Sequence, residues 1–358
     1  MKKNQTSNEI LNDPLETIST VNLTQNHIKE NVNLYMGEKA FDLYFDEDDH
    51  YRSVYSRDGT YVLCYGSRGY VSSLNVQNMT DSFEKNFDDS IRCGTYLHNE
   101  NNIAISQKKN LFIYNNLGVE VHCVREIKES NKLEFLPYHF LLACVNKKGI
   151  TYLDTSIGKI VSKIDCRNEE IVGSMDGVIY LGHNDGTVTL HAPIQDEYLM
   201  KIKTGNDLVH IATSYNYLYT STSNSIKQFD LRNYFKELKT IKKSGGKLAT
   251  TSKEYISTYR NKNIDVFDTK LNLIHNTKLT ESINTVSFNS FEDICVATTR
   301  KRVKFLLFPG TADVNFDTRE ISPFLTKKQK QEREVKMLLE KIPPEMISYN
   351  SEVFSNFN

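Results

Sequence analysis

The chain has 358 residues, of which 39% are hydrophobic and 25% are charged, and its formal net charge is −1. These values are ordinary for a folded globular protein and exclude the compositions typical of disordered or fibrous chains. Its polar N-terminus is unlike a secretory signal, and no run of 18 apolar residues exists, so we expect a soluble, intracellular protein without a membrane-spanning segment.

The two ends of the chain carry opposite charge, although the total is almost neutral. Residues 1–50 contain four lysines and ten acidic residues, whereas residues 300–341 contain eleven Lys or Arg and six acidic residues. Such an asymmetry favours interaction segments attached to a neutral body.

The N-terminal part reads as an extension. The first 34 residues are rich in Asn, Thr and Ser and show little hydrophobic periodicity, which is typical of disorder. The acidic run 46–49 that follows lacks the ligand spacing of a calcium loop and is interpreted as a solvated loop. We therefore assign residues 1–48 to a flexible acidic extension.

From residue 49 to residue 308, short β-favouring runs recur at a regular interval. The best preserved unit is 178–192, in which an Asp-Gly pair between two runs predicts a tight hairpin. A period near 40 with several short strands per repeat is typical of a WD-repeat propeller. We predict an all-β, seven-bladed β-propeller over 49–308. The residues that close the first six runs lie 38 to 40 apart: Asn75, Asn115, Asp154, Ala192, Asp230 and Asp268.

The chain departs from the WD pattern because it contains no Trp. Phe229 and Phe267 precede Asp where that Trp would stand, and Phe can fill the same space without an indole donor.

No stretch of the propeller predicts chemistry. The six cysteines form no CxxC pair and are interpreted as reduced thiols, and the nine histidines form no metal-binding motif. An enzyme with carboxylates in its central channel would need Asp, Glu or Arg on the first strand of each blade, and these strands read as mostly apolar and small. We expect no catalytic residue, no metal, no cofactor and no small-molecule substrate.

The tail, residues 309–347, changes character and predicts a helix. Thr326 and Gln329 form a capping box, and Pro343 ends the helical pattern after Ile342. The helix is amphipathic, and Glu332 and Lys336 have the spacing of an ion pair. Its apolar stripe consists of Val335, Leu338, Leu339 and Ile342, and its basic face of Lys327, Lys328, Lys330, Arg333 and Lys341. Residues 348–358 are interpreted as a disordered tail.

Two interpretations of this helix stay open. It packs on the propeller rim with a solvated basic face, or it reaches outward to RNA or another subunit, which the unusually basic start favours. The candidate RNA- or partner-binding residues are Lys327, Lys328, Lys330, Arg333, Lys336, Leu338, Leu339 and Ile342.

The tail also resembles a known family. Pro309-Gly310, 315–317 (NFD), 326–335 (TKKQKQEREV) and 338–347 (LLEKIPPEMI) are similar to the C-terminal module of the U3 small nucleolar RNA-associated protein 7 family. The resemblance extends upstream through the blades and covers about residues 35–347. The family commonly has Trp where His191 stands and Gly-Glu where Ala312-Asp313 stand.

This resemblance implies a WD-repeat component of the small-subunit processome. We expect a non-catalytic, nucleolar scaffold for the processing of precursor ribosomal RNA to 18S rRNA. The implied partners are precursor ribosomal RNA, the U3 particle and other WD-repeat and processome proteins. The alternative is a cytoplasmic WD-repeat adaptor of a ubiquitin-ligase or coat complex.

Overall fold

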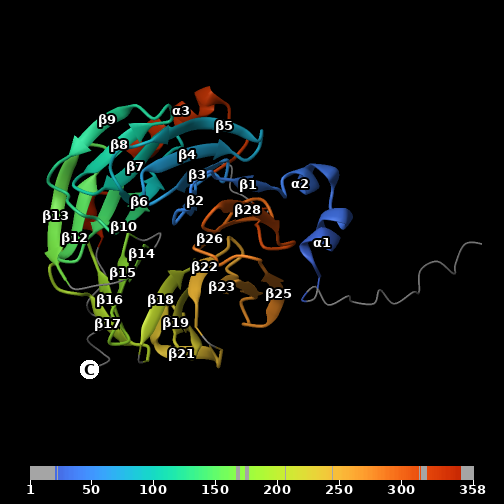
Figure 1. The fold of residues 1–358 in the computed structure, drawn as a ribbon. Coiled ribbons are helices and arrows are strands. Elements are labelled where there is room, and N and C mark those ends of the chain that lie inside the picture. Colours follow the sequence, from blue (N-terminus) through green and yellow to red (C-terminus); the bar gives the residue numbers. More distant parts are fainter. Residues whose placement is uncertain are drawn as a thin grey trace, which may run out of the picture.

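The fold is a seven-bladed β-propeller, as the repeat interval predicts. The structure is a computed structural model that describes residues 21, 23–166, 170–173, 177–205, 207–243, 245–313, 315 and 321–347. Within these residues, 28 strands form seven antiparallel four-stranded sheets, which Figure 1 shows as blades around a central axis. No helix in the described part of the chain is long and apolar enough to cross a membrane.

Six blades are formed by consecutive strands, because each strand returns beside the previous one through a short turn. Blade 1 is β2 (Arg52–Tyr55), β3 (Tyr61–Tyr65), β4 (Tyr70–Asn75) and β5 (Thr80–Asn86). Blade 2 is β6 (Ile91–Tyr96), β7 (Asn102–Gln107), β8 (Leu111–Asn115) and β9 (Glu120–Val124). Blade 3 is β10 (Lys132–Leu136), β11 (Leu141–Val145), β12 (Gly149–Asp154) and β13 (Lys159–Asp165).

The remaining blades follow the same order with one exception. Blade 4 is β14 (Glu170–Gly173), β15 (Ile179–Gly182), β16 (Thr187–His191) and β17 (Met200–Lys203). Blade 5 is β18 (Leu208–Thr213), β19 (Tyr217–Thr222), β20 (Ile226–Asp230) and β21 (Asn233–Ile241). Blade 6 is β22 (Lys247–Thr250), β23 (Ile256–Arg260), β24 (Asn263–Phe267) and β25 (Leu273–Lys278). Blade 7 has β26 (Thr285–Phe288), β27 (Ile294–Thr298) and β28 (Arg302–Leu307), and takes its outer strand from the N-terminal region.

That outer strand, β1 (Asp42–Tyr44), closes the ring. Leu43 pairs with Val303, and the aromatic ring of Phe41 stacks on Phe305 with centroids 4.5 Å apart. A strand from one end of the chain thus covers the edge of the last blade, which would otherwise present unpaired backbone groups.

Two helices anchor this closing strand, α1 (Gln25–Asn31) and α2 (Leu34–Glu38), seen beside β28 in Figure 1. The Gln25 amide accepts from the Leu307 N–H (2.9 Å) and donates to its carbonyl (3.1 Å), as a neighbouring strand would. The Lys39 side chain is 2% exposed, so it must be paired, and it contacts Glu292 at 2.6 Å.

The propeller therefore starts before the predicted boundary at residue 49. Of the acidic run, Asp46, Glu47 and Asp48 are exposed, as a solvated loop requires, but Asp49 is buried and accepts from the Arg68 N–H at 2.8 Å. Residues 1–20 of the predicted extension and the predicted tail 348–358 lie outside the described residues.

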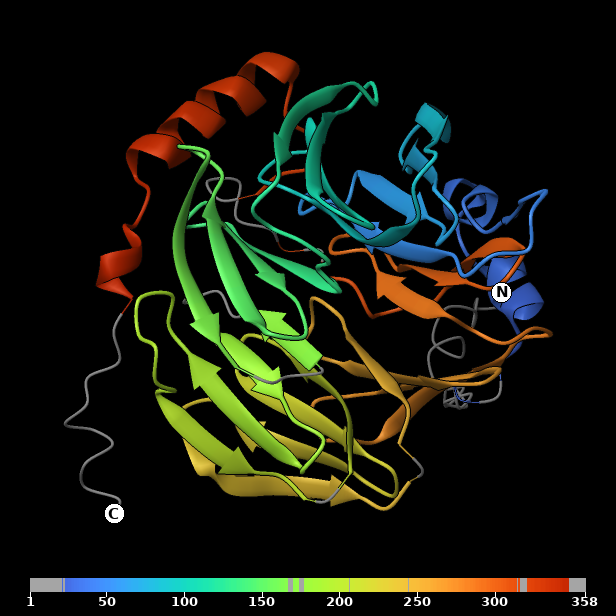
Figure 2. The same cartoon turned by 60° about the vertical axis from the view of Figure 1, so that its left-hand side comes forward.

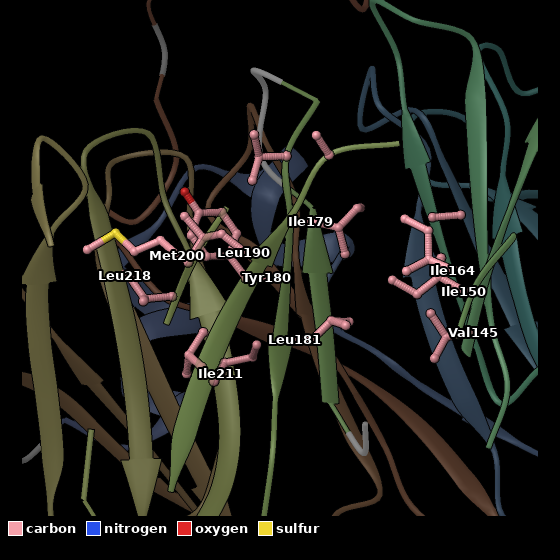
Figure 3. Close-up of a cluster of buried hydrophobic side chains, with 14 of the residues drawn as sticks. Val145, Ile150, Ile164, Ile179, Tyr180, Leu181, Leu190, Met200, Ile211 and Leu218 are labelled. Carbon is pink, nitrogen blue, oxygen red and sulfur yellow. The ribbon is translucent and has the colours of Figure 1, made fainter. Parts of the chain in front are cut away.

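The core lies between adjacent blades. Figure 3 shows Ile150 of blade 3 and Ile211 of blade 5 on either side of Ile179 and Leu181 of blade 4. Phe229 and Phe267, at the positions of the absent Trp, are both buried. These aromatic rings fill the space that the WD pattern gives to indole.

In blade 4, polar side chains provide the hydrogen bonding that the indole N–H of the Trp would otherwise supply. His183 contacts the Thr189 hydroxyl (2.7 Å), which also contacts the buried His191 (3.1 Å). Burial, and then the charge of His183, lowers the pKa of His191 to about 4, so this imidazole is neutral at pH 7. A neutral imidazole supplies the polar contact inside the blade without burying a charge.

The inner strands are mostly apolar and small, as the sequence predicts, but four of them also carry a cationic residue. The first strands of blades 1, 3 and 6 begin with Arg52, Lys132 and Lys247, and Arg92 is the second residue of β6.

The six cysteines are all free, four of them buried and Cys123 and Cys166 half-buried.

Ring closure generates the first testable prediction. Replacing Phe41 with Ala removes a half-buried ring stacked on Phe305, and we expect a loss of about 2–3 kcal/mol of unfolding free energy. Leu34→Ala is the control, because this side chain is 78% exposed and its loss should change stability by no more than about 0.5 kcal/mol. Urea unfolding followed by circular dichroism measures the stability of both variants. Equal stability of the two would show that β1 does not stabilise the closed propeller.

Candidate partner-binding site on the C-terminal strap

The described residues from Pro309 to Ile347 form a strap that crosses one face of the propeller. The strap starts at blade 7, where the backbone N–H groups of Gly310 and Ala312 donate to Asp293 at 2.9 and 2.8 Å. It reaches blade 1 where Gln77 donates to the Pro323 carbonyl (3.4 Å).

The far end of the strap is fixed on blades 3 and 4. The Ile342 N–H donates to the Tyr138 carbonyl (3.1 Å), and the His139 ring Nδ1 lies 3.0 Å from the Ile342 carbonyl. Ile347 is buried in the core cluster of blades 3 to 5, close to Gly177, whose φ of +83° excludes most other residues. The strap therefore connects five blades, from 7 through 1, 2 and 3 to 4.

Helix α3 (Lys327–Leu339) is the central element of the strap, and Figure 2 shows it in red along the edge of the disc. The capping box is present: the Thr326 N–H donates to Gln329 Oε1 (3.0 Å), and the Gln329 N–H donates to Thr326 Oγ1 (3.4 Å). The helix ends three residues before the predicted Ile342. A short 3₁₀ turn, η2 (Pro344–Met346), follows.

The side of α3 that carries Lys330 faces the propeller. Lys330 Nζ lies 2.9 Å from Asp58 of blade 1 and 2.7 Å from Glu100 of blade 2. The side chains of Arg333 and Met337, one and two turns further along, are half-buried on the same side. Beyond the helix, Lys341 forms an ion pair with Asp154 of blade 3.

The apolar stripe is not buried by the propeller, although two of its side chains are partly covered. The exposed fractions of its four side chains are 58% for Val335, 39% for Leu338, 83% for Leu339 and 40% for Ile342. An amphipathic helix ordinarily buries its apolar side. Here the ion pairs hold the helix and leave the apolar side in solvent.

The ion pairs are mutually stabilising. Burial acts to raise the pKa of Asp58, but Lys330 and two hydroxyl donors hold it below its ordinary value. Burial acts to lower the pKa of Lys330, but Asp58 and Glu100 hold it above its ordinary value. Each group therefore stays charged at neutral pH because its partner is charged.

A small cavity of about 50 Å³ lies beneath the start of α3, between the strap and blades 1 and 2. Arg57, Asp58, His98, Glu100, Lys330 and Arg333 are among the residues that line it. Burial, then the charges of Arg57 and Arg333, lowers the pKa of His98 to about 4. The His98 imidazole, which lies between the strap and blades 1 and 2, is therefore neutral at pH 7.

The candidate residues predicted from sequence thus divide between two sides of the strap. Lys330 and Arg333 face the propeller, and Lys330 already has two carboxylate partners. Lys328 pairs with Glu332 (3.8 Å), and Lys336 pairs with Glu340 (3.7 Å) and not with the predicted Glu332. The candidates exposed to solvent are Lys327, Lys328, Lys336, Leu338, Leu339 and Ile342.

Sequence reasoning missed the acceptors on the propeller. Nothing in the local sequence around Asp58 or Glu100 marks either residue as an acceptor for the strap. They lie 272 and 230 residues from Lys330 along the chain, so no local pattern reveals the contact. Among the described residues, no group of three or more His, Cys, Asp or Glu side chains could hold a metal ion.

The ion pairs of Lys330 predict how strongly α3 is held on the propeller. Lys330→Gln leaves two largely buried carboxylates without their cation, and we expect it to weaken docking by about 3 kcal/mol. Amide exchange over residues 331–339 should then accelerate about tenfold or more. Lys328→Gln is the matched control, since its side chain is 86% exposed and it should leave exchange unchanged. Equal exchange in both variants would contradict docking through Lys330.

The lowered pKa of His98 predicts that the stability of the protein depends on pH. Because the folded-state pKa of His98 is lowered, its contribution to stability is complete above the ordinary pKa of 6.5 and is lost as the pH falls from 6.5 to about 4. We expect wild-type protein to lose more stability than His98→Gln between pH 7 and pH 5, by at most about 1 kcal/mol per pH unit. Urea unfolding at each pH measures this difference, and parallel pH profiles would contradict it.

The strap and the last blade match a known protein family. The family described as BING4CT (NUC141) domain matches residues 272–350, which include the end of blade 6, all three sequential strands of blade 7 and the strap. A solved β-propeller domain of Myceliophteria thermophila Cps50 (Swd1) superposes with a TM-score of 0.65, covering 75% of this chain and all of that one. At 11% identity, this likeness concerns the fold alone.

Curated relatives align along nearly the whole chain. WD repeat-containing protein 46 of Mus musculus is 34% identical over 92% of this chain, and that of Homo sapiens is 33% identical over 92%. U3 small nucleolar RNA-associated protein 7 of Saccharomyces cerevisiae is 29% identical over 96%. The chain spans 56%, 57% and 68% of the length of these three relatives. The protein is thus a homologue of WD repeat-containing protein 46 and U3 small nucleolar RNA-associated protein 7.

Proposed function

We propose that this protein is a non-catalytic scaffold of the small-subunit processome, needed for processing of precursor ribosomal RNA to 18S rRNA in the nucleolus. The relatives named above support the proposal, one of them through its association with U3 small nucleolar RNA. A rigid disc with an added strap suits the joining of several partners.

The observation that carries the proposal is the orientation of α3. Lys330 holds one side of the helix on blades 1 and 2, and the stripe of Val335, Leu338, Leu339 and, just beyond the helix, Ile342 is 39–83% exposed. Burying such side chains against a partner gains roughly 1.5–3 kcal/mol for each one fully covered. We propose that another protein subunit of the particle covers this stripe.

The exposed lysines give the same surface a second property. Lys327, Lys328 and Lys336 surround the stripe, and the ion pairs of Lys328 and Lys336 are long, exposed helix pairs worth little in water. We propose that the three lysines bind phosphates of precursor ribosomal RNA beside the protein partner. Replacing all three with Gln should lower the salt slope of RNA binding by roughly 0.7–0.9 for each phosphate that is no longer neutralised.

The decisive experiment is co-purification of the tagged full chain. We expect U3 RNA, precursor ribosomal RNA and processome proteins with wild type, and at least a tenfold loss of all three with Leu338→Asp/Leu339→Asp. Tyr215→Asp/Leu238→Asp, which alters two exposed apolar residues of blade 5, is the matched control and should co-purify like wild type. Recovery of ubiquitin-ligase or coat subunits without U3 RNA would favour the adaptor alternative.

Production of 18S rRNA in cells that depend on each variant is the second readout. The stripe variant should be folded, because both leucines are exposed and lie outside the propeller core, yet it should fail to support 18S production. If it supports normal 18S levels and enters the particle, the stripe is not the assembly surface.

A further inference from the structure

One end of the central channel is surrounded by cationic residues from four blades. Arg52, Lys132 and Lys247 each begin their inner strand, and each pairs with the last or next-to-last residue of the second strand of its blade. Arg92 lies one residue into β6, at a bulge. Equivalent register in a closed ring brings these residues to the same level of the channel.

The pKa values of Lys132 and His210 are consistent with cationic groups gathered around one channel. Lys132 and Lys247 belong to blades 3 and 6, which are not neighbours in the ring. Burial, then Lys247 and Arg52, lowers the pKa of Lys132 to about 8. Burial, then Lys132 and Lys247, lowers the pKa of His210 in blade 5 to about 3. The repulsion therefore acts across the axis.

The cationic groups are both held in place and open to solutes. The Arg52 guanidinium donates to the Arg92 carbonyl (2.7 Å), Arg92 donates to Asn131 Oδ1 (3.1 Å), and Lys247 donates to the Asn284 carbonyl (3.3 Å). A guanidinium has five N–H donors and an ammonium has three, so Arg52 and Lys247 have donors beyond those used in these contacts. Arg52 and Lys247 are exposed, and Arg92 and Lys132 are half-buried.

Carboxylates in the channel do not cancel this charge. Glu129 lies 3.7 Å from Arg92 but is 65% exposed, and Glu134 acts to raise the pKa of Lys132. The pKa of Lys132 nevertheless stays below its ordinary value, because burial and then the charges of Lys247 and Arg52 outweigh the effect of Glu134. Folding keeps these cations together at a cost that a bound anion would remove.

We propose that this end of the channel is a binding site for a phosphate group, held by Arg52, Lys132 and Lys247. Arginine forks and lysine ammonium groups are the side chains that bind phosphate oxygens most strongly. A doubly charged phosphate, free or at the end of an RNA chain, matches several cations better than a single carboxylate does. The site lies on inner strands and not on the strap, so it is independent of the proposed scaffold function.

The test compares phosphate binding by three full-length proteins at constant ionic strength. Wild type should bind inorganic phosphate in calorimetry and unfold at a higher temperature in phosphate than in chloride. Lys132→Met/Lys247→Met should bind about tenfold or more weakly and lose the phosphate-dependent shift. Lys201→Met/Lys203→Met, on the exposed outer strand β17, removes the same charge and should behave as wild type.

Further measurements identify the source of the phosphate and guard against misfolding. A ribo-oligonucleotide with a 5′-phosphate should displace inorganic phosphate more strongly than its 5′-hydroxyl form if an RNA end is the ligand, and equally if the free anion is. Lys247→Gln, at an exposed position, replaces the double variant if that variant does not fold. No phosphate-specific shift in wild type, or the same shift in the channel and β17 variants, would overturn the proposal.

Discussion

Pairing of β1 with β28 is the constraint on which the rest of the structure depends. A ring of blades has one seam, and here the seam is closed by Asp42–Tyr44, supported by Phe41 on Phe305 and by the buried Lys39–Glu292 ion pair. An open ring would let neighbouring blades separate, and it would leave the edge of β28 without its hydrogen-bonding partner. Closure fixes the distances between the loops of different blades, so a strap can be anchored on five of them at once.

In the strap, ion pairs with the loops of the propeller orient the amphipathic helix α3, and burial of its apolar side does not. Asp58 and Glu100 come from two different blades and converge on Lys330, and Asp154 of a third blade takes Lys341. Two carboxylates held close together need a cation, so the closed ring selects the charged side of α3. The apolar side is left for another molecule, and the fold thereby turns an ordinary amphipathic pattern into a presented surface.

The same closed geometry concentrates charge at the axis. Arg52, Lys132 and Lys247 are far apart along the chain and belong to three blades, yet ring closure brings them around one channel. Stability alone would favour small or apolar residues at these positions. The two surfaces that we propose for ligands, the inner cations for an anion and the outer strap for an apolar partner, are thus separate parts of one propeller.

The amino-acid sequence by itself determined the repeat, and hence the seven blades, because turn residues and alternating apolar runs act over a few residues. It also determined the start of α3, since the Thr326–Gln329 capping box is a local contact. Only the tertiary structure decided that Leu43 belongs to blade 7, that Lys330 faces Asp58, and that Lys132 faces Lys247. These contacts join residues more than 100 positions apart, and no local preference encodes them; they arise when the ring closes and brings distant loops and strand ends to the same place.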